Sequence, residues 1–359
     1  MKKKIAFVIP SLQTGGMERV MSELLKQFHI NYDLELHLVL YGKTRGVFYK
    51  VPDSVIIHKP QFQFSDKLRF WHTLKTLFFL RRKLKSLNAK AILSFGEYWN
   101  NLVLLSTYGL SLPVFISDRS QPGKTLGIFH NHLRKWLYPK AKGIIVQSDK
   151  AKEIYQQMVR LNNIRVIGNP IREITNNLPI ERENIVLSVG RLINTKNFDL
   201  LISMFIKVKE PGWRLIIVGD DAIKQKNRIK LQTLINDLNV GDRVVLAGNR
   251  SDVEKFYLKS KLFAFTSSSE GFPNVIGEAL SAGLPVVAFN CIAGPSEMIV
   301  DGENGFLVPI FNETLFMKKL FLLMQDKDLR QEMSIHAQQS INKYSASNIA
   351  NDFYNFMMK

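Results

Sequence analysis

Residues Ser267–Leu280, with the sequence SSSEGFPNVIGEAL, decide the fold of this chain. The apolar run Leu262–Thr266 precedes them and has the length of a buried strand. Pro273 suits the first turn of a helix, so Glu270 falls in the loop after the strand and Glu278 in the first turns of the helix. Ligands bind at this edge of an open parallel sheet, and two carboxylates suit a ligand with vicinal hydroxyl groups. From the spacing alone, a helix cap and a solvated side chain explain the two glutamates equally well.

The Glu-x7-Glu pattern and the sequence after it resemble glycosyltransferase family 4. The matching continuation is AGLPVVA at 282–288, GPSE at 294–297 and DGENGFLV at 301–308. The resemblance extends from Gly15 to about Pro309. It implies a retaining enzyme with the α/β GT-B fold, in which two Rossmann-like domains face a central cleft and the C-terminal helix crosses back to the first domain.

The chain has 359 residues, which suggests two domains rather than one core. Predicted strands alternate with helical stretches, and this alternation indicates a parallel sheet in each half. We predict strands at 4–10, 34–40, 54–58, 91–95, 114–117, 143–147 and 164–167, and again at 185–189, 214–218, 243–247, 262–266, 286–288 and 306–308. Residues 1–170 with the C-terminal helix 341–359 are expected to bind the acceptor. Residues 171–340 are expected to bind the nucleotide sugar, after a polar linker at 172–184.

Two basic residues follow the first predicted strand of the second domain. A diphosphate leaving group needs cations near its oxygens, and Arg191 offers a planar fork while Lys196 offers a point charge. Two solvated basic residues are the alternative. The resemblance assigns both residues to the donor diphosphate, Glu278 to the nucleotide ribose and Glu270 to the sugar ring, where we predict it to be catalytic.

A glycine loop, Gly15-Gly16, follows the first predicted strand and opens a helix, which is a favourable place for an anion. The resemblance assigns these glycines to close approach to the donor pyrophosphate; a simple turn is the alternative. The other predicted donor contacts lie at the start of the helix that carries Glu278 and after the strand at 243–247: Gly271, Phe272, Asn274, Val275, Asn249 and Arg250.

We predict no metal and no cofactor, because the nucleotide diphosphate sugar is itself the donor substrate. Asp220 and Asp221 could suggest a metal pair, but adjacent aspartates after a strand are more typical of a turn. The resemblance also implies a site that works without a divalent ion. Neither the Gly-x-Gly-x-x-Gly fingerprint nor a Walker loop occurs, so NAD and ATP are disfavoured.

The first domain offers less specific candidates. Many family members have a histidine after the strand equivalent to 114–117, whereas this chain has Ser117-Asp118-Arg119-Ser120. We predict that Asp118 orients the acceptor hydroxyl or stabilises positive charge on the sugar, and that Arg119 could hold a phosphate. Glu97 is a second candidate, and structural salt bridges explain these residues equally well.

The charge is concentrated in the first half of the chain. Residues 1–180 have 28 Lys and Arg against 11 Asp and Glu, a net +17, whereas residues 181–359 have 21 against 20, a net +1. The strong positive charge of residues 1–180 suits an anionic partner for this part of the chain. In the predicted helix at 66–87 we expect one broad apolar face formed by Phe70, Leu74, Leu77, Phe78, Leu80 and Leu84, with His72, Lys75, Arg82 and Lys83 on the other.

This helix and a basic aromatic stretch at 129–140 favour an anionic membrane surface, with core helices and solvated lysines as the alternative. No recognised nucleic-acid motif accompanies the charge, so we expect no nucleic acid. A single cysteine, Cys291, fits a reducing cytoplasm, and no apolar run approaches the roughly 20 residues of a membrane span. We expect a cytoplasmic bacterial protein at the inner face of the cell membrane.

The expected reaction transfers a hexose or N-acetylhexosamine from a nucleotide diphosphate sugar, expected to be UDP-linked, to a glycan acceptor, expected to be lipid-linked. It would serve the biosynthesis of cell-surface polysaccharide or oligosaccharide. A UDP-sugar epimerase of the same architecture and a basic nucleic-acid-binding protein remain alternatives. A phosphorylase would need a pyridoxal-phosphate lysine, for which no local signature stands out.

Overall fold

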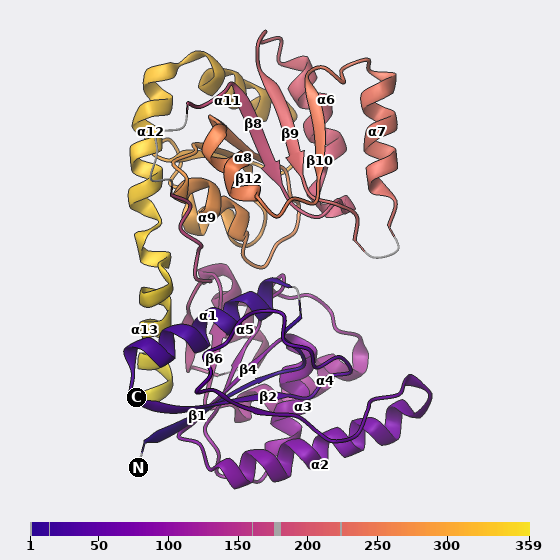
Figure 1. Cartoon of the computed structure of the whole chain (residues 1–359), viewed down its shortest axis with the longest axis vertical. Coiled ribbons are helices and arrows are strands. Elements are labelled where there is room, and N and C mark those ends of the chain that lie inside the picture. Colours follow the sequence, from indigo (N-terminus) through magenta and orange to yellow (C-terminus); the bar gives the residue numbers. More distant parts are fainter. Residues whose placement is uncertain (1, 14, 160, 176–180, 223–224) are drawn as a thin grey trace. The chain divides into compact units, whose positions relative to one another are not determined.

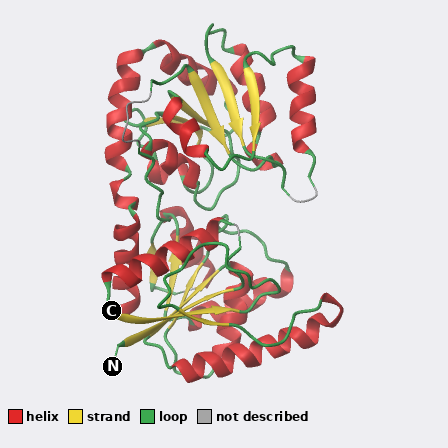
Figure 2. Ribbon diagram, in the orientation of Figure 1, coloured by secondary structure: helices red, strands yellow, loops and turns green. Residues whose placement is uncertain are grey.

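The structure is a computed structural model that describes residues 2–359 except 14, 160, 176–180 and 223–224. The chain forms two compact units: unit 1 comprises Met1–Pro170 and Ala346–Lys359, and unit 2 comprises Ile171–Ser345. Residues 341–345, which the sequence analysis grouped with the first domain, therefore belong to unit 2. In each unit a parallel sheet is flanked by helices (Figures 1 and 2).

Unit 1 contains a seven-stranded sheet with the order β3-β2-β1-β4-β5-β6-β7, and all neighbouring strands are parallel. Residues 5–9 are fully buried because helices cover both faces of the sheet. The strands are β1 (Lys3–Ile9), β2 (Leu34–Leu40), β3 (Ile56–His58), β4 (Ala91–Phe95), β5 (Val114–Ser117), β6 (Gly143–Val146) and β7 (Ile164–Val166).

The helices of unit 1 divide between the two faces of its sheet. Alternate residues of β1 point to opposite faces, so Ala6 and Val8 join the core formed with α2 to α5, whereas Phe7 contacts Phe28 of α1. Helix α13, from the end of the chain, contacts α1, and its Tyr354 lies 6.0 Å from the Phe28 ring centroid (Figure 1). The helices are α1 (Gly16–Asn31), α2 (Arg69–Leu87), α3 (Glu97–Thr107), α4 (Ile128–Leu137), α5 (Asp149–Val159) and α13 (Ala346–Met358), with short 3-10 turns η1 (Asp66–Leu68) and η2 (Tyr138–Lys140).

Helix α2 buries only part of the apolar face that the sequence analysis predicted, through Leu80 and Leu84. Phe70, Trp71 and Phe78 are 69%, 62% and 71% exposed. His72, predicted on the polar face, is buried instead and stacks on Phe62. The predicted apolar face is wider than the part of a helix surface that can pack on one sheet. The residues that do pack on the sheet follow one another mainly at spacing i, i+4. The buried residues of α2 are His72, Thr76, Leu80, Leu84 and Leu87.

Unit 2 contains a six-stranded parallel sheet with the order β10-β9-β8-β11-β12-β13. Its strands are β8 (Ile185–Val189), β9 (Arg214–Val218), β10 (Val244–Gly248), β11 (Leu262–Phe265), β12 (Val286–Phe289) and β13 (Gly305–Val308). Its helices are α6 (Phe198–Lys207), α7 (Asn227–Asp237), α8 (Val253–Lys259), α9 (Asn274–Ser281), α10 (Pro295–Met298), α11 (Glu313–Gln325) and α12 (Lys327–Ser340), with 3-10 turns η3 (Asn194–Lys196) and η4 (Asn342–Tyr344). Every predicted strand is present, with ends that shift by at most two residues.

In both sheets the strand order reverses beside the first strand. Strand β1 lies between β2 and β4, and β8 lies between β9 and β11. The loops that follow β8 and β11 therefore meet at the carboxyl edge of unit 2, the kind of edge at which open α/β sheets bind ligands. Within the described part of the chain, no helix combines the length and the apolar character needed to cross a membrane.

Candidate functional site

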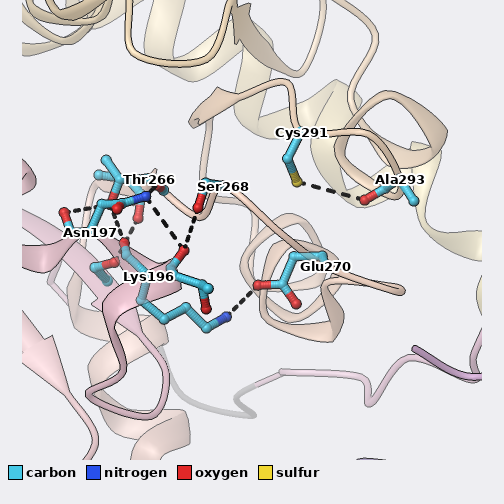
Figure 3. Close-up of polar contacts among 10 residues, drawn as sticks. Lys196, Asn197, Thr266, Ser268, Glu270, Cys291 and Ala293 are labelled. Atoms are coloured by element: carbon cyan, nitrogen blue, oxygen red, sulfur yellow. Dashed lines mark hydrogen bonds and ion pairs between the residues drawn. The ribbon is translucent and has the colours of Figure 1, made fainter. Parts of the chain in front are cut away.

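An ion pair joins the two loops at the strand reversal of unit 2. The ammonium of Lys196, at the end of η3, lies 2.5 Å from Oε1 of Glu270, in the loop after β11 (Figure 3). Their side chains are 15% and 16% exposed. The same ammonium lies 5.4 Å from the centre of the Phe265 ring. The structure thus brings together a cation and a carboxylate that the sequence analysis placed in one site.

Hydrogen bonds to backbone carbonyls hold the two loops against each other. The side-chain amide of Asn197 donates to the carbonyl of Thr266 at 2.8 Å, and the Thr266 hydroxyl donates to the carbonyl of Lys196 at 2.8 Å. The N–H of Ser268 donates to the carbonyl of Thr195 at 2.9 Å (Figure 3). Asn197 has a φ of 51°, a left-handed conformation that asparagine tolerates better than most residues. These contacts hold the two loops together and thereby fix the positions of Lys196 and Glu270.

Glu278 has different neighbours from Glu270. It lies in α9, and its Oε2 accepts a hydrogen bond of 3.1 Å from the hydroxyl of Tyr257 in α8. The guanidinium of Arg172 lies 4.0 Å from its Oε1 and 2.9 Å from Oε1 of Glu254. The sequence analysis missed Arg172, which it placed in the linker; its charge at the predicted domain boundary was the only sequence signal.

The predicted amide contacts lie around the start of α9. Gly271 and Phe272 are in the loop, while Asn274 and Val275 are the first two residues of the helix. The N–H of Asn274 already donates to the carbonyl of Phe272 at 3.0 Å. The Phe272 side chain is buried and contacts the Tyr344 ring at 5.5 Å, so it anchors the loop.

The neighbouring loop after β12 supports this turn through Gly294. Gly294 has a φ of 104°, and a Cβ there would lie 2.1 Å from Cδ of Pro273. Only glycine allows this contact, which holds the residue just before α9.

Three other predicted contacts lie on exposed loops. Arg191 shares its loop with Lys196 and makes no ion pair with any described residue. Asn249 and Arg250 follow β10, with β9 between them and β8. Arg250 pairs with Asp252 at 3.0 Å, and this contact raises the pKa of Arg250 and lowers that of Asp252.

Asp118 is buried inside unit 1. Its carboxylate accepts hydrogen bonds from Asn100 at 2.7 Å, from Tyr138 at 2.8 Å and from Tyr155. Burial, and secondly the charge of Glu97, raises the pKa of Asp118 to about 7. Three helical elements thus converge on one side chain, an arrangement that favours a structural role over direct contact with an acceptor.

Glu97 and Arg119 also serve local structure. Oε1 of Glu97 accepts hydrogen bonds from the N–H groups of Arg119 and Ser120 at 2.9 and 2.7 Å. The guanidinium of Arg119 lies over the rings of Phe95 and Phe353, 4.4 and 5.3 Å from their centres. Burial lowers the pKa of Arg119 to about 9. Arg119 therefore connects α13 to β4, and this geometry does not favour a phosphate site.

The glycine loop of unit 1 is closed by a tyrosine. The hydroxyl of Tyr49 donates to the carbonyl of Gly15 at 3.2 Å and lies 3.3 Å from its N–H. A Cβ at Gly15 would lie 2.2 Å from Oε2 of Glu18, so a side chain there would require Glu18 to move. Gly16 is the first residue of α1, and residue 14 lies outside the described residues.

The predicted turn at Asp220-Asp221 caps a helix. Oδ1 of Asp221 accepts hydrogen bonds from the N–H groups of Asn227 and Arg228, at the start of α7. Among the residues that the structure describes, no three His, Cys, Asp or Glu side chains are arranged to hold a metal ion.

Comparison with known families matches almost the whole chain. Residues 14–173 match the family described as Glycosyltransferase Family 4, and residues 170–340 match Glycosyl transferases group 1. A Campylobacter jejuni protein named GalNAc-alpha-(1->4)-GalNAc-alpha-(1->3)-diNAcBac-PP-undecaprenol alpha-1,4-N-acetyl-D-galactosaminyltransferase is 27% identical over 98% of this chain and 97% of its own length. The amylovoran biosynthesis glycosyltransferase AmsD of Erwinia amylovora is 27% identical over 92% of each chain.

Solved structures share the fold over the full length. Anabaena Alr3699/HepE in complex with UDP superposes with a TM-score of 0.81 at 19% identity, covering 98% of both chains. The lipopolysaccharide outer core galactosyltransferase WaaB gives a TM-score of 0.77 at 20% identity, covering 99% of both chains. The GT-B prediction made from the sequence is confirmed.

Proposed function

Because this chain belongs to the family 4 glycosyltransferases of the GT-B fold, we propose that it transfers a hexose or N-acetylhexosamine from a UDP-sugar to a lipid-linked glycan with retention of anomeric configuration. The Lys196–Glu270 pair at the strand reversal of unit 2 carries the proposal. A diphosphate at this edge would draw the ammonium onto its oxygens and leave the Glu270 carboxylate to face the sugar. Unit 2 would then bind the donor, and unit 1 the acceptor.

The proposed step is front-face substitution. The bond between the anomeric carbon and the diphosphate oxygen breaks, and a bond to the acceptor hydroxyl forms on the same face. The leaving phosphate oxygen takes the acceptor proton. Lys196 and the exposed Arg191 would stabilise the negative charge that grows on that phosphate.

The choice of UDP and of a lipid-linked acceptor draws support from the relatives. HepE has been solved with UDP, and the Campylobacter jejuni relative is named for an undecaprenol diphosphate acceptor. We therefore propose a role in the biosynthesis of cell-surface polysaccharide or oligosaccharide.

A transfer assay tests the reaction class. UDP-hexoses and UDP-N-acetylhexosamines are incubated with and without undecaprenyl diphosphate-linked saccharides, and the linkage is read by proton NMR. We expect donor consumption only with acceptor, and a product with the donor's anomeric configuration. Conversion of the donor without acceptor would favour the epimerase, and an inverted linkage would reject retention. A salt-sensitive gel shift on DNA and RNA addresses nucleic-acid binding.

We also propose that unit 1 docks on the anionic cytoplasmic face of the cell membrane. The exposed side of α2 combines Phe70, Trp71 and Phe78 with Lys75 and Arg82, and this mixture suits a charged bilayer interface. Each basic residue near anionic lipid contributes about 1 kcal/mol, so a few suffice for reversible binding. Ile128 and Phe129 of α4, 81% and 71% exposed, would add shallow insertion.

Liposome co-sedimentation tests the membrane proposal. We expect binding to phosphatidylglycerol vesicles, little binding to phosphatidylcholine vesicles, and weaker binding at high salt. The double change Lys75→Glu and Arg82→Glu should reduce binding strongly. The control, Lys226→Glu with Lys230→Glu, alters net charge equally on exposed residues of unit 2 and should leave binding unchanged. Equal loss in both variants would contradict a docking surface on α2.

A further inference from the structure

Residues 171–174, where the chain begins unit 2, lie along helix α9. The N–H of Ile174 donates to the hydroxyl of Ser281, the last residue of α9, at 2.9 Å. The side chain of Ile171 packs on Gly277, where an added Cβ would lie 2.6 Å from Cδ1 of Ile171. The N–H of Ile171 donates to the carbonyl of Tyr344 at 2.9 Å. The segment is thus fixed to the helix that carries Glu278.

Arg172 lies between two carboxylates of neighbouring helices. Its guanidinium contacts Glu254 of α8 at 2.9 Å and approaches Glu278 of α9 at 4.0 Å. The Glu254 side chain is 52% exposed and that of Glu278 is 12% exposed, so Arg172 contacts a solvated glutamate and a largely enclosed one. Tyr257 donates to the other oxygen of Glu278.

We propose that Arg172 is a positioning residue for the donor, because it offsets the repulsion between Glu254 and Glu278 and holds the Glu278 carboxylate where the nucleotide ribose would bind. The inference rests on the proposed function, which makes the ribose the ligand of Glu278. Without the guanidinium, two like charges on adjacent helices repel each other. Glu278 would then turn away from the ribose position, and the contact of residues 171–174 with α9 would loosen.

This role predicts a specific kinetic signature. A hydrogen bond to the ribose is made equally in the ground state and in the transition state, so its loss raises KM and leaves kcat unchanged. For Arg172→Gln we expect the KM of the UDP-sugar to rise about fivefold, with kcat within about twofold of wild type. Arg172→Lys, which keeps the charge, should have a KM between those of wild type and Arg172→Gln.

A double variant separates positioning from a general structural effect. Removing the second carboxylate removes the repulsion, so Arg172→Gln with Glu254→Gln should recover most of the wild-type KM. Arg214→Gln is the matched control, because Arg214 forms a similar part-exposed pair with Glu183 in the same unit, at 2.6 Å. It should leave KM unchanged. No recovery in the double variant, or an equal rise in the control, would overturn the proposal.

Hydrogen exchange gives a readout that is independent of catalysis. UDP should slow exchange of the Ile171 and Ile174 amides in wild type, because occupancy of Glu278 would stabilise α9 and the segment on it. The slowing should be lost in Arg172→Gln at UDP concentrations that saturate that variant. Equal slowing in both proteins would overturn the coupling.

Calorimetry with UDP distinguishes failure of this inference from failure of the proposed function. If wild type does not bind UDP, the proposed function falls together with this inference. If wild type binds UDP and Glu278→Ala binds it as tightly, Glu278 is not a nucleotide ligand and only this inference falls. If Glu278→Ala weakens UDP binding and Arg172→Gln does not, only the role of Arg172 falls.

Discussion

Lys196 pairs with Glu270 across two loops, which places its charge beside the edge where we propose the diphosphate binds. Lys196→Ala should lower kcat more than it raises KM, because the charge on the leaving phosphate grows towards the transition state. A hydrogen bond to a charged group contributes about 1.5–3 kcal/mol, so the loss should be roughly 10- to 150-fold. Steady-state kinetics measure this effect.

Arg191→Lys should also be impaired, since a point charge does not reproduce the planar fork. Lys230→Ala, on the exposed surface of α7, is the control and should keep wild-type rates. Wild-type affinity of both site variants for UDP would exclude Arg191 and Lys196 as a diphosphate clamp.

Asp118 should make the stability of unit 1 depend on pH. Its folded pKa of about 7 lies above the usual value, so between pH 4 and 7 the folded chain keeps a proton that the unfolded chain has lost. The free energy of unfolding should therefore fall as pH rises through this window, by a few kcal/mol. Asp118→Asn cannot ionise and should remove that dependence, as measured by urea unfolding at pH 5 and 7.5.

Asp33→Asn is the control for this experiment. Asp33 is 80% exposed on the surface of the same unit, so the variant should keep the wild-type pH dependence. If the free energy of unfolding changes equally with pH in wild type and Asp118→Asn, Asp118 is already ionised at pH 5.

For single residues, the sequence predicted the positions of those that belong to a short motif. Glu270 lies beside Lys196 as expected, because both follow strands that are neighbours in the sheet. The sequence did not predict the burial of Asp118, since the donors that surround it come from 18, 20 and 37 residues away. It also missed Arg172, whose partner Glu254 is distant in sequence and carries no motif.

Among the elements, the turn before α9 depends on Gly294. Gly294→Ala should cost about 2–4 kcal/mol, because it adds a clash with Pro273 to a strained φ of 104°. Gly302→Ala is a matched control with a φ of 84° and no atom within 4 Å of the added Cβ, and it should cost only about 1–2 kcal/mol. Chemical unfolding gives the stabilities, and UDP titration should show a loss of affinity only for Gly294→Ala. Equal costs would mean that the loop after β12 adjusts freely.

Helix α2 and the predicted linker show the limits of sequence patterns at this scale. Periodicity marked α2 correctly as a helix, yet the side it buries depends on which stripe meets the sheet. Polarity suggested a linker at 172–184, but residues 171–174 are bound to α9 by a hydrogen bond and by packing on Gly277. Residues 176–180 of that linker lie outside the described residues.

For the whole molecule, two units with separate cores predict two unfolding transitions. Phe353 of α13 is fully buried in unit 1. Phe353→Ala should therefore destabilise unit 1 by about 3–5 kcal/mol and lower the temperature of its unfolding transition. UDP should raise the temperature of the unfolding transition of unit 2, because a ligand stabilises the unit that binds it. Scanning calorimetry with and without UDP measures both effects.

The control is Ile335→Ala in α12, where the side chain is 52% exposed and should matter little to either transition. If Phe353→Ala and UDP shift the same transition, either the units unfold together or UDP binds to unit 1.

Helix α13 also sets a delay in biosynthesis. Residues up to Pro170 of unit 1 are made long before Ala346–Lys359, yet unit 1 is completed only by that last segment. At the usual 5–20 residues per second, translation from residue 170 to residue 346 takes roughly 9–35 s. Throughout that time the nascent chain exposes the apolar surfaces of α1 and β4 that Tyr354 and Phe353 later cover. A chain stalled on the ribosome at residue 340 should therefore bind chaperones and be cleaved by protease within unit 1. A synthetic peptide of residues 346–358 should protect it.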